Sequence, residues 1–317
     1  MFQTFPTDYI HVIVCGRLFC LQGTAMTTTH KMDSRELGLV LGKQLLGVED
    51  LHYGLWEPDL VPSLTNLPLA QQRYTEHLAQ ALPPLDGEVR VLDVGCGTGH
   101  ILKQLTERGY RVDGVIPSPS LARMVHARLA ELPGNQARVF ETTFEGMPVA
   151  EVEGQYDAIL FSESFQYIDL NTVLGHCARL LKPHGRVVIC DFFKTPAAGD
   201  GQPGDGVIGG GHHLSDFRAA LAAAPFDVLR DEDITALVAP NLDILDDLLM
   251  QKLKPSGEAI WEYLRGSRPF VAWLLGFFLR KRMPKVKKKY FSGLRTGATF
   301  ARYKNYRLVV LTKRDAV

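Results

Sequence analysis

The stretch VLDVGCGTGHIL, Val91–Leu102, decides the fold of this chain. An apolar run carries an acid, Asp93, near its end, and glycines follow at alternate positions, Gly95, Gly97 and Gly99. Glycines between a strand and a helix let ligand atoms approach the backbone, because no Cβ stands in the way and a positive φ costs little. The apolar residues of HILKQLTERG then recur at helical spacing. The stretch therefore predicts a buried strand, a ligand-binding turn and a helix.

The spacing of the glycines distinguishes between two classes of ligand. A dinucleotide-binding turn needs G-x-G-x-x-G, with the pyrophosphate on the helix N-terminus. Here the third glycine comes one residue too early, and Asp93 places a negative charge where a pyrophosphate would lie. S-adenosylmethionine carries an ammonium and a sulfonium and no phosphate, so this pattern favours it as the cofactor. A nicotinamide-dependent oxidoreductase is the weaker alternative.

The middle of the chain alternates strand and helix patterns, which predicts a parallel sheet with helices on both faces. The expected strands are EVRVLDVGCG, YRVDGVIPSP, ARVFETTFE, YDAILFSES and RVVICDFFK. Asn171 and Ser215 are the expected N-caps of two of the helices. After a Gly/Pro-rich loop the pattern predicts a strand in FDVLRDEDIT, helices over about residues 241–282 and a last strand in ATFARYKNYRLVVLTKR.

Composition excludes several classes of protein. The chain has 35 Lys plus Arg and 35 Asp plus Glu among 317 residues, which argues against a nucleic-acid binder. Its five cysteines are scattered without a CxxC pair, so we expect no metal site and a reducing, cytoplasmic location. The apolar stretch YIHVIVCGRLFCLQG follows no basic region, so we expect an upstream extension with the true start at Met26 or Met32. A degenerate signal peptide is the lesser alternative.

Three motifs carry a family resemblance. VLDVGCGTG, YDAILFSESFQYI and RLLKPHGRVVICDFF together resemble the class I S-adenosylmethionine-dependent methyltransferases over about residues 50–315. EDLHYGLWEP before the core, and DEDIT and YKNYRLVVLTK after it, resemble the branch that methylates small molecules. The resemblance implies a Rossmann-like α/β fold. Its seven-stranded, mostly parallel sheet has an antiparallel last strand, helices on both faces and a helical lid insertion.

The resemblance also implies a domain organisation. We expect a poorly ordered N-terminal extension (1–31), a helical cap (32–85), the cofactor-binding core (86–240), a helical lid and acceptor region (241–298) and the last core strand (299–317).

The cofactor site follows from the resemblance one position at a time. The expected cofactor-binding residues are Tyr53, Asp93, Gly95, Cys96, Gly97, Gly99, Ile116, Thr143, Phe144 and Ser162. The family usually places an acid that binds the ribose where this chain has Ile116. Asp113 has the opposite strand parity, so its side chain is expected to point away from the ribose. The ribose would then depend on backbone groups or on Ser118. Phe144 could equally be an ordinary core residue.

Side chains at the carboxyl ends of parallel strands line the ligand crevice. Glu163 is therefore the leading general base, although a solvated or helix-capping glutamate is nearly as good an interpretation. His52 stands beside Tyr53, which the resemblance places over the cofactor. The expected catalytic residues are Glu163, His213 and His52, and the expected acceptor-binding residues are Trp56, Tyr167 and His212.

The segment PFVAWLLGFFLRKRMPKVKKKY has the most unusual local composition. Residues 270–279 are almost all apolar, and seven cations follow without an acid. A membrane span needs about 20 apolar residues, so this run is too short to cross one. Two hypotheses remain open. One is a lid helix over an apolar pocket, and the other is peripheral contact of residues 270–290 with an anionic membrane.

The sequence thus predicts an enzyme that transfers a methyl group from S-adenosylmethionine to a small, apolar acceptor. The acceptor atom, oxygen, carbon or nitrogen, and the oligomeric state stay open. The missing ribose acid at Ile116 keeps a second class of protein in view, a non-catalytic cofactor-binding protein of the same fold.

Overall fold

The computed structural model describes residues 9–14, 17–22, 44, 52–134, 136–281 and 283–315 of the chain. The expected extension 1–31 lies largely outside these residues, as does the part of the expected cap 32–85 that precedes residue 52. The expected start sites Met26 and Met32 also lie outside the described residues. The boundaries of these two regions therefore remain predictions.

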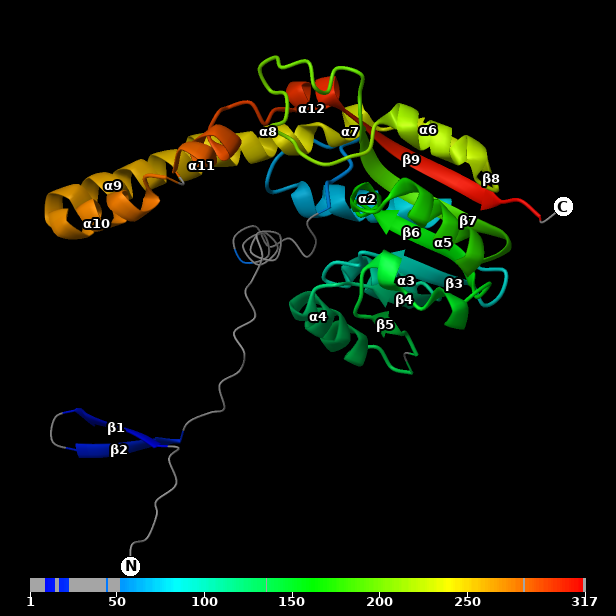
Figure 1. Cartoon of the computed structure of the whole chain (residues 1–317), viewed down its shortest axis with the longest axis horizontal. Coiled ribbons are helices and arrows are strands. Elements are labelled where there is room, and N and C mark those ends of the chain that lie inside the picture. Colours follow the sequence, from blue (N-terminus) through cyan, green and yellow to red (C-terminus); the bar gives the residue numbers. More distant parts are fainter. Residues whose placement is uncertain are drawn as a thin grey trace, which may run out of the picture.

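The centre of the molecule is a seven-stranded mixed sheet (Figure 1). Its strands are β3 (Arg90–Val94), β4 (Arg111–Val115), β5 (Val139–Phe140), β6 (Tyr156–Ser162), β7 (Leu181–Lys194), β8 (Phe226–Asp233) and β9 (Lys304–Lys313). They lie in the order β5-β4-β3-β6-β7-β9-β8, and β9 runs antiparallel to the other six strands. β1 (Tyr9–Val14) and β2 (Arg17–Gln22) form a separate antiparallel hairpin. The predicted fold class is confirmed.

The helices make up most of the rest of the described chain. They are α2 (Leu67–Ala81), α3 (His100–Glu107), α4 (Pro119–Ala130), α5 (Leu170–Leu180), α6 (Leu214–Ala223), α7 (Thr235–Val238), α8 (Pro240–Asp247), α9 (Lys254–Ser267), α10 (Pro269–Leu279), α11 (Met283–Tyr290) and α12 (Gly297–Tyr303). A π-helical turn (Leu248–Leu253) joins α8 to α9.

The central strands are apolar on both faces because helices cover both. On β3, Val91 packs in one cluster with Leu102 of α3 and Val125 of α4, and α2 adds to this side. The next residue, Leu92, packs in a second cluster with Leu174 of α5, which also contains residues of α6. Successive side chains of a strand point to opposite faces. The two clusters therefore lie on the two sides of the sheet, as the alternating pattern predicts.

Two predicted helix caps are wrong. Asp169, rather than Asn171, precedes α5, and its side chain accepts a hydrogen bond from the Thr172 amide. The N-cap position of α6 is His213, so Ser215 lies inside the helix. In both cases the helix begins earlier than the apolar periodicity suggested.

The last predicted strand also begins later than residue 299. Thr296 caps α12 by accepting a hydrogen bond from the Thr299 amide, and Phe300 and Tyr303 are buried one helical turn apart. The chain turns into β9 only at Lys304.

The predicted helical region 241–282 is confirmed and projects from the body of the molecule. α8, the π-helical turn and α9 follow one another directly, and α10 folds back against α9. Figure 1 shows these helices extending to the left of the sheet. None of the described helices is both long and apolar enough to cross a membrane.

Candidate active site

A cavity of ≈ 520 Å³ opens at the carboxyl ends of β3, β4 and β6. It brings together most of the residues that the sequence singled out, although they are scattered over more than a hundred positions. Those that line it are His52, Asp93, Gly95, Cys96, Gly97, Ile116, Thr143, Phe144, Ser162, Glu163 and Tyr167. Sequence reasoning missed other lining residues, among them Leu121, Glu145 and Ser164. No local pattern marks these three, which reach the cavity only through the fold.

The glycine turn forms one wall of this cavity. The Gly95 amide donates to the Val115 carbonyl of β4 at 2.9 Å. Gly95 has φ +75°, and a Cβ there would stand 2.6 Å from Cβ of Ser164. Gly97 has φ +55°, and a Cβ there would meet no atom within 4 Å. Gly95 therefore permits close packing, whereas Gly97 leaves open space for a ligand against the backbone.

Gly99 serves a different purpose from the one expected. It is the N-cap of α3 with φ +79°, and a Cβ there would lie 3.2 Å from a Val125 methyl group of α4. It does not line the cavity. Its smallness lets α3 approach α4, which gives this glycine a role in helix packing.

We expect Gly97→Ala to weaken binding of S-adenosylhomocysteine at least tenfold, because its methyl group would enter the cavity. The left-handed backbone adds a strain of about 1–2 kcal/mol. Gly154→Ala is the matched control, since Gly154 has φ +63°, a Cβ there would meet no atom within 4 Å, and the residue lies outside the cavity. Calorimetric titration gives the affinity and thermal unfolding gives the strain. Equal affinities of the two variants would contradict a cofactor role for Gly97.

Asp93 supplies negative charge to the cavity. Its side chain is only 2% exposed, and it lies on β3 just before the glycine turn. A carboxylate in the wall of a cavity attracts a positively charged group of a ligand, such as the ammonium group of a cofactor.

The structure confirms that Asp113 points away from the cavity. Its carboxylate accepts hydrogen bonds from the Arg90 side chain at 2.7 Å, the Arg138 amide at 2.8 Å and the Tyr156 hydroxyl at 2.8 Å. Ile116 lines the cavity where the family acid is expected. Ser118 stands nearby, but its hydroxyl caps α4 by accepting from the Leu121 amide at 3.3 Å.

Phe144 combines the two roles that the sequence left open. It is 2% exposed and packs edge-on against Phe161 with ring centroids 5.5 Å apart. It also lines the cavity next to Thr143. The Thr143 hydroxyl accepts a hydrogen bond from the Gly146 amide at 3.3 Å, which fixes the turn that carries both residues.

Glu163 is held in place by two donors from distant parts of the chain. One carboxylate oxygen, Oε1, accepts from the Tyr53 amide at 2.7 Å and from the Tyr306 hydroxyl at 2.9 Å. The backbone of Glu163 has φ +55°, a strained conformation for a non-glycine residue. Such strain concentrates at functional sites, where the surroundings enforce it. Sequence reasoning did not find Tyr306, which β9 brings in from 143 positions away.

A chain of hydroxyl groups extends from Glu163 into the core. The Tyr306 hydroxyl lies 2.9 Å from the Tyr74 hydroxyl, which lies 3.3 Å from that of Ser162. Burial raises the pKa of Tyr306 and of Tyr53, and the charge of Glu163 raises both further. The Tyr306 hydroxyl therefore stays protonated and keeps donating to the carboxylate.

His52 lies in the cavity wall, stacked on Tyr74 with ring centroids 4.6 Å apart. Its Nδ1 is 2.9 Å from the Tyr53 carbonyl oxygen, so Nδ1 carries the proton and donates it to that oxygen. In the neutral ring Nε2 is then the basic nitrogen. The Tyr53 ring packs against Phe300 and Tyr306 and does not line the cavity. Tyr53 thus contributes its backbone, not the ring that the resemblance implied.

Three further expected site residues, besides Gly99 and Tyr53, do not line the cavity. The centroids of the His212 and Phe165 rings lie 5.9 Å apart, and the backbone of His213 forms an isolated β-bridge with Lys194, the last residue of β7. Trp56 is buried in a small apolar cluster with Leu60 and Ala70. None of these three residues lines the cavity with Glu163.

A second buried acid, Asp191, stands behind Glu163. It accepts hydrogen bonds from the Gln166 amide at 3.0 Å, the Gln166 side chain at 3.1 Å and the Phe192 amide at 2.8 Å. Burial nevertheless raises the pKa of Asp191 to about 8, and the charge of Glu163 adds to the rise.

We expect the free energy of unfolding to fall as the pH rises from about 4 to about 8. Within this window the folded protein binds more protons at Asp191 than the unfolded chain does. The contribution of Asp191 to stability is therefore fully present below pH 3.8 and is lost as the pH rises through about 8. The loss is of the order of a few kcal/mol. Urea unfolding across this range measures it. Asp191→Asn should flatten the slope, and the exposed control Asp216→Asn should not. A slope that survives Asp191→Asn would contradict this assignment.

Within the described ranges no group of three or more His, Cys, Asp or Glu side chains is arranged to hold a metal ion.

Comparison with known proteins agrees with this geometry. Residues 91–185 match a family model described as a methyltransferase domain. The chain is 27% identical over 208 residues to 27-O-demethylrifamycin SV methyltransferase of Amycolatopsis mediterranei (strain S699), covering 62% of this chain and 74% of that protein. It is 33% identical over 110 residues to ubiquinone biosynthesis O-methyltransferase of Xanthomonas oryzae pv. oryzae (strain PXO99A). That match covers 34% of this chain and 45% of the relative, so the chain spans less than half the relative's length.

A solved structure shows the same fold. Geranyl diphosphate C-methyltransferase from Streptomyces coelicolor A3(2), in complex with Mg²⁺, geranyl-S-thiolodiphosphate and S-adenosyl-L-homocysteine, aligns with a TM-score of 0.61 and 19% identity. The alignment covers 87% of this chain and 91% of that one. The glycine turn, the cavity beside it, the sheet order and these likenesses agree. Residues 91–185 therefore carry a methyltransferase domain, and the chain is similar to S-adenosylmethionine-dependent methyltransferases that act on small molecules.

Proposed function

We propose that the protein methylates a small, lipophilic acceptor at an oxygen or carbon atom, with Glu163 as the proton acceptor. The observation that carries the proposal is the Glu163 carboxylate, fixed in the cavity wall by Tyr53 and Tyr306. The names of the similar proteins support this choice of atom, since they include O-methyltransferases and a C-methyltransferase. A nitrogen acceptor depends less on a base than an oxygen or carbon acceptor does, because a neutral amine is already nucleophilic.

The residues present fit the proposed cofactor. Gly97 leaves open space against the backbone, and Asp93 adds negative charge at the same end of the cavity. When bound, S-adenosylmethionine supplies an activated methyl group on a sulfonium. Asp93 would hold the ammonium, and the apolar Ile116 would face the ribose. The loss of one charge-assisted hydrogen bond at position 116 costs about 1.5–3 kcal/mol of affinity, which weakens cofactor binding without abolishing it.

Glu163 and His52 are the two residues expected to be catalytic from the sequence that line the cavity. Tyr306 and the Tyr53 amide orient the carboxylate of Glu163, and the Tyr53 carbonyl orients the His52 ring. A positioned base contributes about 10²–10⁴-fold to the rate of a proton transfer. Alignment of the acceptor with the methyl group can lower the activation barrier by a further amount of about 7–11 kcal/mol. We assign Glu163 as the base and Tyr167, at the rim of the same cavity, to contact with the acceptor.

We further propose that the enzyme is cytoplasmic and works at a membrane surface, where a lipophilic acceptor would partition. Residues 270–290, which combine apolar and basic side chains, would make that contact.

The decisive experiment incubates the purified protein and methyl-labelled cofactor with extracts fractionated by polarity. We expect labelled product in the apolar fraction, and its identification gives the acceptor and the atom. Label only in polar amines would contradict the proposed acceptor class. Binding of a nicotinamide dinucleotide, or cofactor binding with no labelled product in any fraction, would favour the two alternatives kept open by the sequence.

A further inference from the structure

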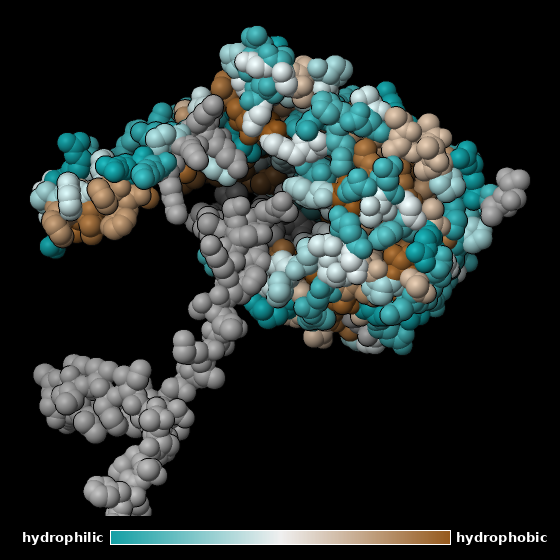
Figure 2. All heavy atoms as spheres, in the orientation of Figure 1, coloured by the Kyte–Doolittle hydropathy of each residue, from teal (hydrophilic) through white to brown (hydrophobic). Residues whose placement is uncertain are grey.

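The helices α9 and α10, together with Arg280 and Lys281, form an arm that exposes an unusual amount of apolar surface. Phe270 is 71% exposed, Phe278 68% and Trp273 64%. The rings of Phe270, Trp273 and Phe277 stack in succession, with centroids 6.0 and 6.2 Å apart. Figure 2 shows the brown patch of this arm at the left of the molecule, with hydrophilic atoms above it. A helix that is apolar all round is normally buried, so this one needs a covering environment.

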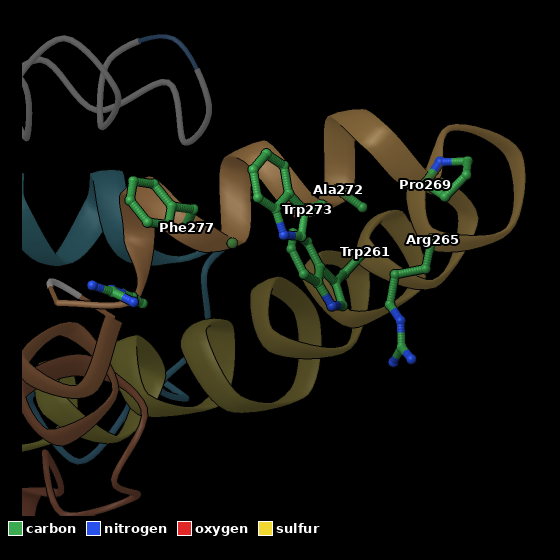
Figure 3. Close-up of a pocket in the computed structure, with 8 residues that line it drawn as sticks. Trp261, Arg265, Pro269, Ala272, Trp273 and Phe277 are labelled. Atoms are coloured by element: carbon green, nitrogen blue, oxygen red, sulfur yellow. The ribbon is translucent and has the colours of Figure 1, made fainter.

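The large side chains face outward because the small ones face α9. Ala272 is 4% exposed, and a Cβ on Gly276 would lie 3.4 Å from the Trp261 ring. These two positions, one helical turn apart, let α10 approach α9 closely. Beside this contact the two helices leave an open hollow of ≈ 620 Å³, which Trp261 of α9 and Trp273 of α10 line (Figure 3).

Cations surround this apolar surface. Arg265 and Arg280 line the hollow, and the guanidinium of Arg280 lies 4.8 Å from the centre of the Phe277 ring. Figure 3 shows Arg265 pointing away from α10. Among the described residues, none of Arg265, Arg268 and Arg280 pairs with a carboxylate. Their charges are thus available to an external partner.

The charge of the chain is divided unevenly. Residues 265–290 contain nine Lys and Arg and no Asp or Glu. Because the whole chain has a formal net charge of zero, all the remaining residues together carry a net charge of −9. An anionic surface would therefore attract this segment and repel the rest, which orients the molecule.

We propose that the arm inserts the aromatic face of α10 into the interface of an anionic membrane leaflet, with Arg265, Arg268, Arg280 and Lys281 on the lipid headgroups. Interfacial helices bury an apolar face at the boundary between headgroups and acyl chains while their cations bind anionic lipid. The arm lies on the surface and does not cross the bilayer, since no described helix is long enough to do so.

The position of the arm gives this contact a consequence for the active site. β8 runs parallel to β7, so it ends at the same edge of the sheet as the strands that form the cavity. α7 and α8 leave the body at that edge, and α12 stays tied to α8 by the Gly297 amide, which donates to Asp243 at 2.8 Å. A docked arm would place this edge next to the bilayer. That step rests on the proposed lipophilic acceptor, whereas the docking itself does not.

The test is sedimentation with vesicles, without cofactor or acceptor. We expect binding to vesicles of equimolar phosphatidylcholine and phosphatidylglycerol, little binding to pure phosphatidylcholine, and weaker binding as salt is added. A cation near an anionic surface contributes about fivefold to the affinity. The variant with Arg265, Arg268, Arg280 and Lys281 changed to Gln should therefore bind more weakly by a hundredfold or more. Trp261 and Trp273 are two of the three tryptophans, so a blue shift of fluorescence on docking reports on the arm.

A second variant isolates the apolar contribution. Phe270→Ser, Trp273→Ser and Phe278→Ser together should abolish vesicle binding. The control, Val61→Ser, Val228→Ser and Leu229→Ser, removes exposed apolar side chains elsewhere and should bind as the wild type does. Cofactor affinity, which all variants should retain, verifies the fold.

Three results would overturn the proposal. They are a wild-type protein that stays in solution, equal binding to neutral and anionic vesicles, and a dimer in solution that only the arm variants disrupt. The last result would identify a second copy of the chain as the occupant of the face. Vesicle binding without methyl transfer would refute the proposed function and leave the docking intact.

Discussion

We expect Glu163→Gln to lower kcat by a factor of about 10²–10⁴ and to leave cofactor affinity within a few-fold of the wild type. Glutamine keeps the size of the side chain and an oxygen that can accept from the Tyr53 amide and the Tyr306 hydroxyl. It lacks the basicity needed to take a proton from the acceptor. Single-turnover transfer of labelled methyl to the acceptor found in the extract assay measures the loss.

Glu145→Gln is the matched control, since Glu145 also lines the cavity. It lies beside Phe144, on the turn expected to hold the adenine of the cofactor. It should leave the rate constant nearly unchanged. In a plot of the logarithm of the rate constant against pH, the Glu163→Gln variant should also lack the fall at low pH that the wild type shows. Loss of a merely structural carboxylate would not remove this fall. Equal rates for wild type and Glu163→Gln would assign proton transfer to His52 or make it unnecessary.

The second large effect is on stability. We expect Asp113→Asn to lower the free energy of unfolding by about 3–5 kcal/mol, because removing one partner of a buried ion pair leaves the others uncompensated. Asp113 is fully buried and receives hydrogen bonds from Arg90, Arg138 and Tyr156. These join β4 to β3, to β6 and to the segment before β5. Urea unfolding, with cofactor affinity measured on the folded fraction, provides the two readouts.

Glu88→Gln serves as the comparison for Asp113→Asn. Glu88 pairs with Arg111 at 3.1 Å with 71% of its side chain exposed, and exposed pairs contribute less than about 1 kcal/mol. Cofactor affinity should survive both changes. If Asp113→Asn lowered the affinity for the cofactor and left the free energy of unfolding unchanged, Asp113 would be the missing ribose ligand. Its assignment by strand parity would then be wrong.

Local patterns were sufficient to predict the core of the fold. The alternation of apolar strands and amphipathic helices gave β3, β4, β6 and β7, because both faces of these strands are covered. Strand parity placed Asp113 away from the cavity, since side chains alternate strictly in a short, regular strand. The glycine turn and its acid were visible because steric freedom and charge are properties of single residues.

What the sequence could not predict depends on contacts between distant residues. Tyr306 reaches Glu163 only because β9 lies next to β7, and no pattern in either segment specifies the distance between the two side chains. Histidines 212 and 213 were candidates by residue type alone, and the loop that carries them runs elsewhere. The α12 segment alternates apolar and polar residues ambiguously, so the burial of Phe300 and Tyr303 decides for a helix.

The order of the strands has a consequence for how the protein is made. β9 is the last described strand, yet it lies between β7 and β8, and it is the sheet partner of β8. While the ribosome is still extending the chain, β8 and the apolar helices after it emerge without the neighbour that anchors them. Completion of the sheet must therefore wait until Lys304–Lys313 has been synthesised, and until then those apolar surfaces stay exposed and can aggregate.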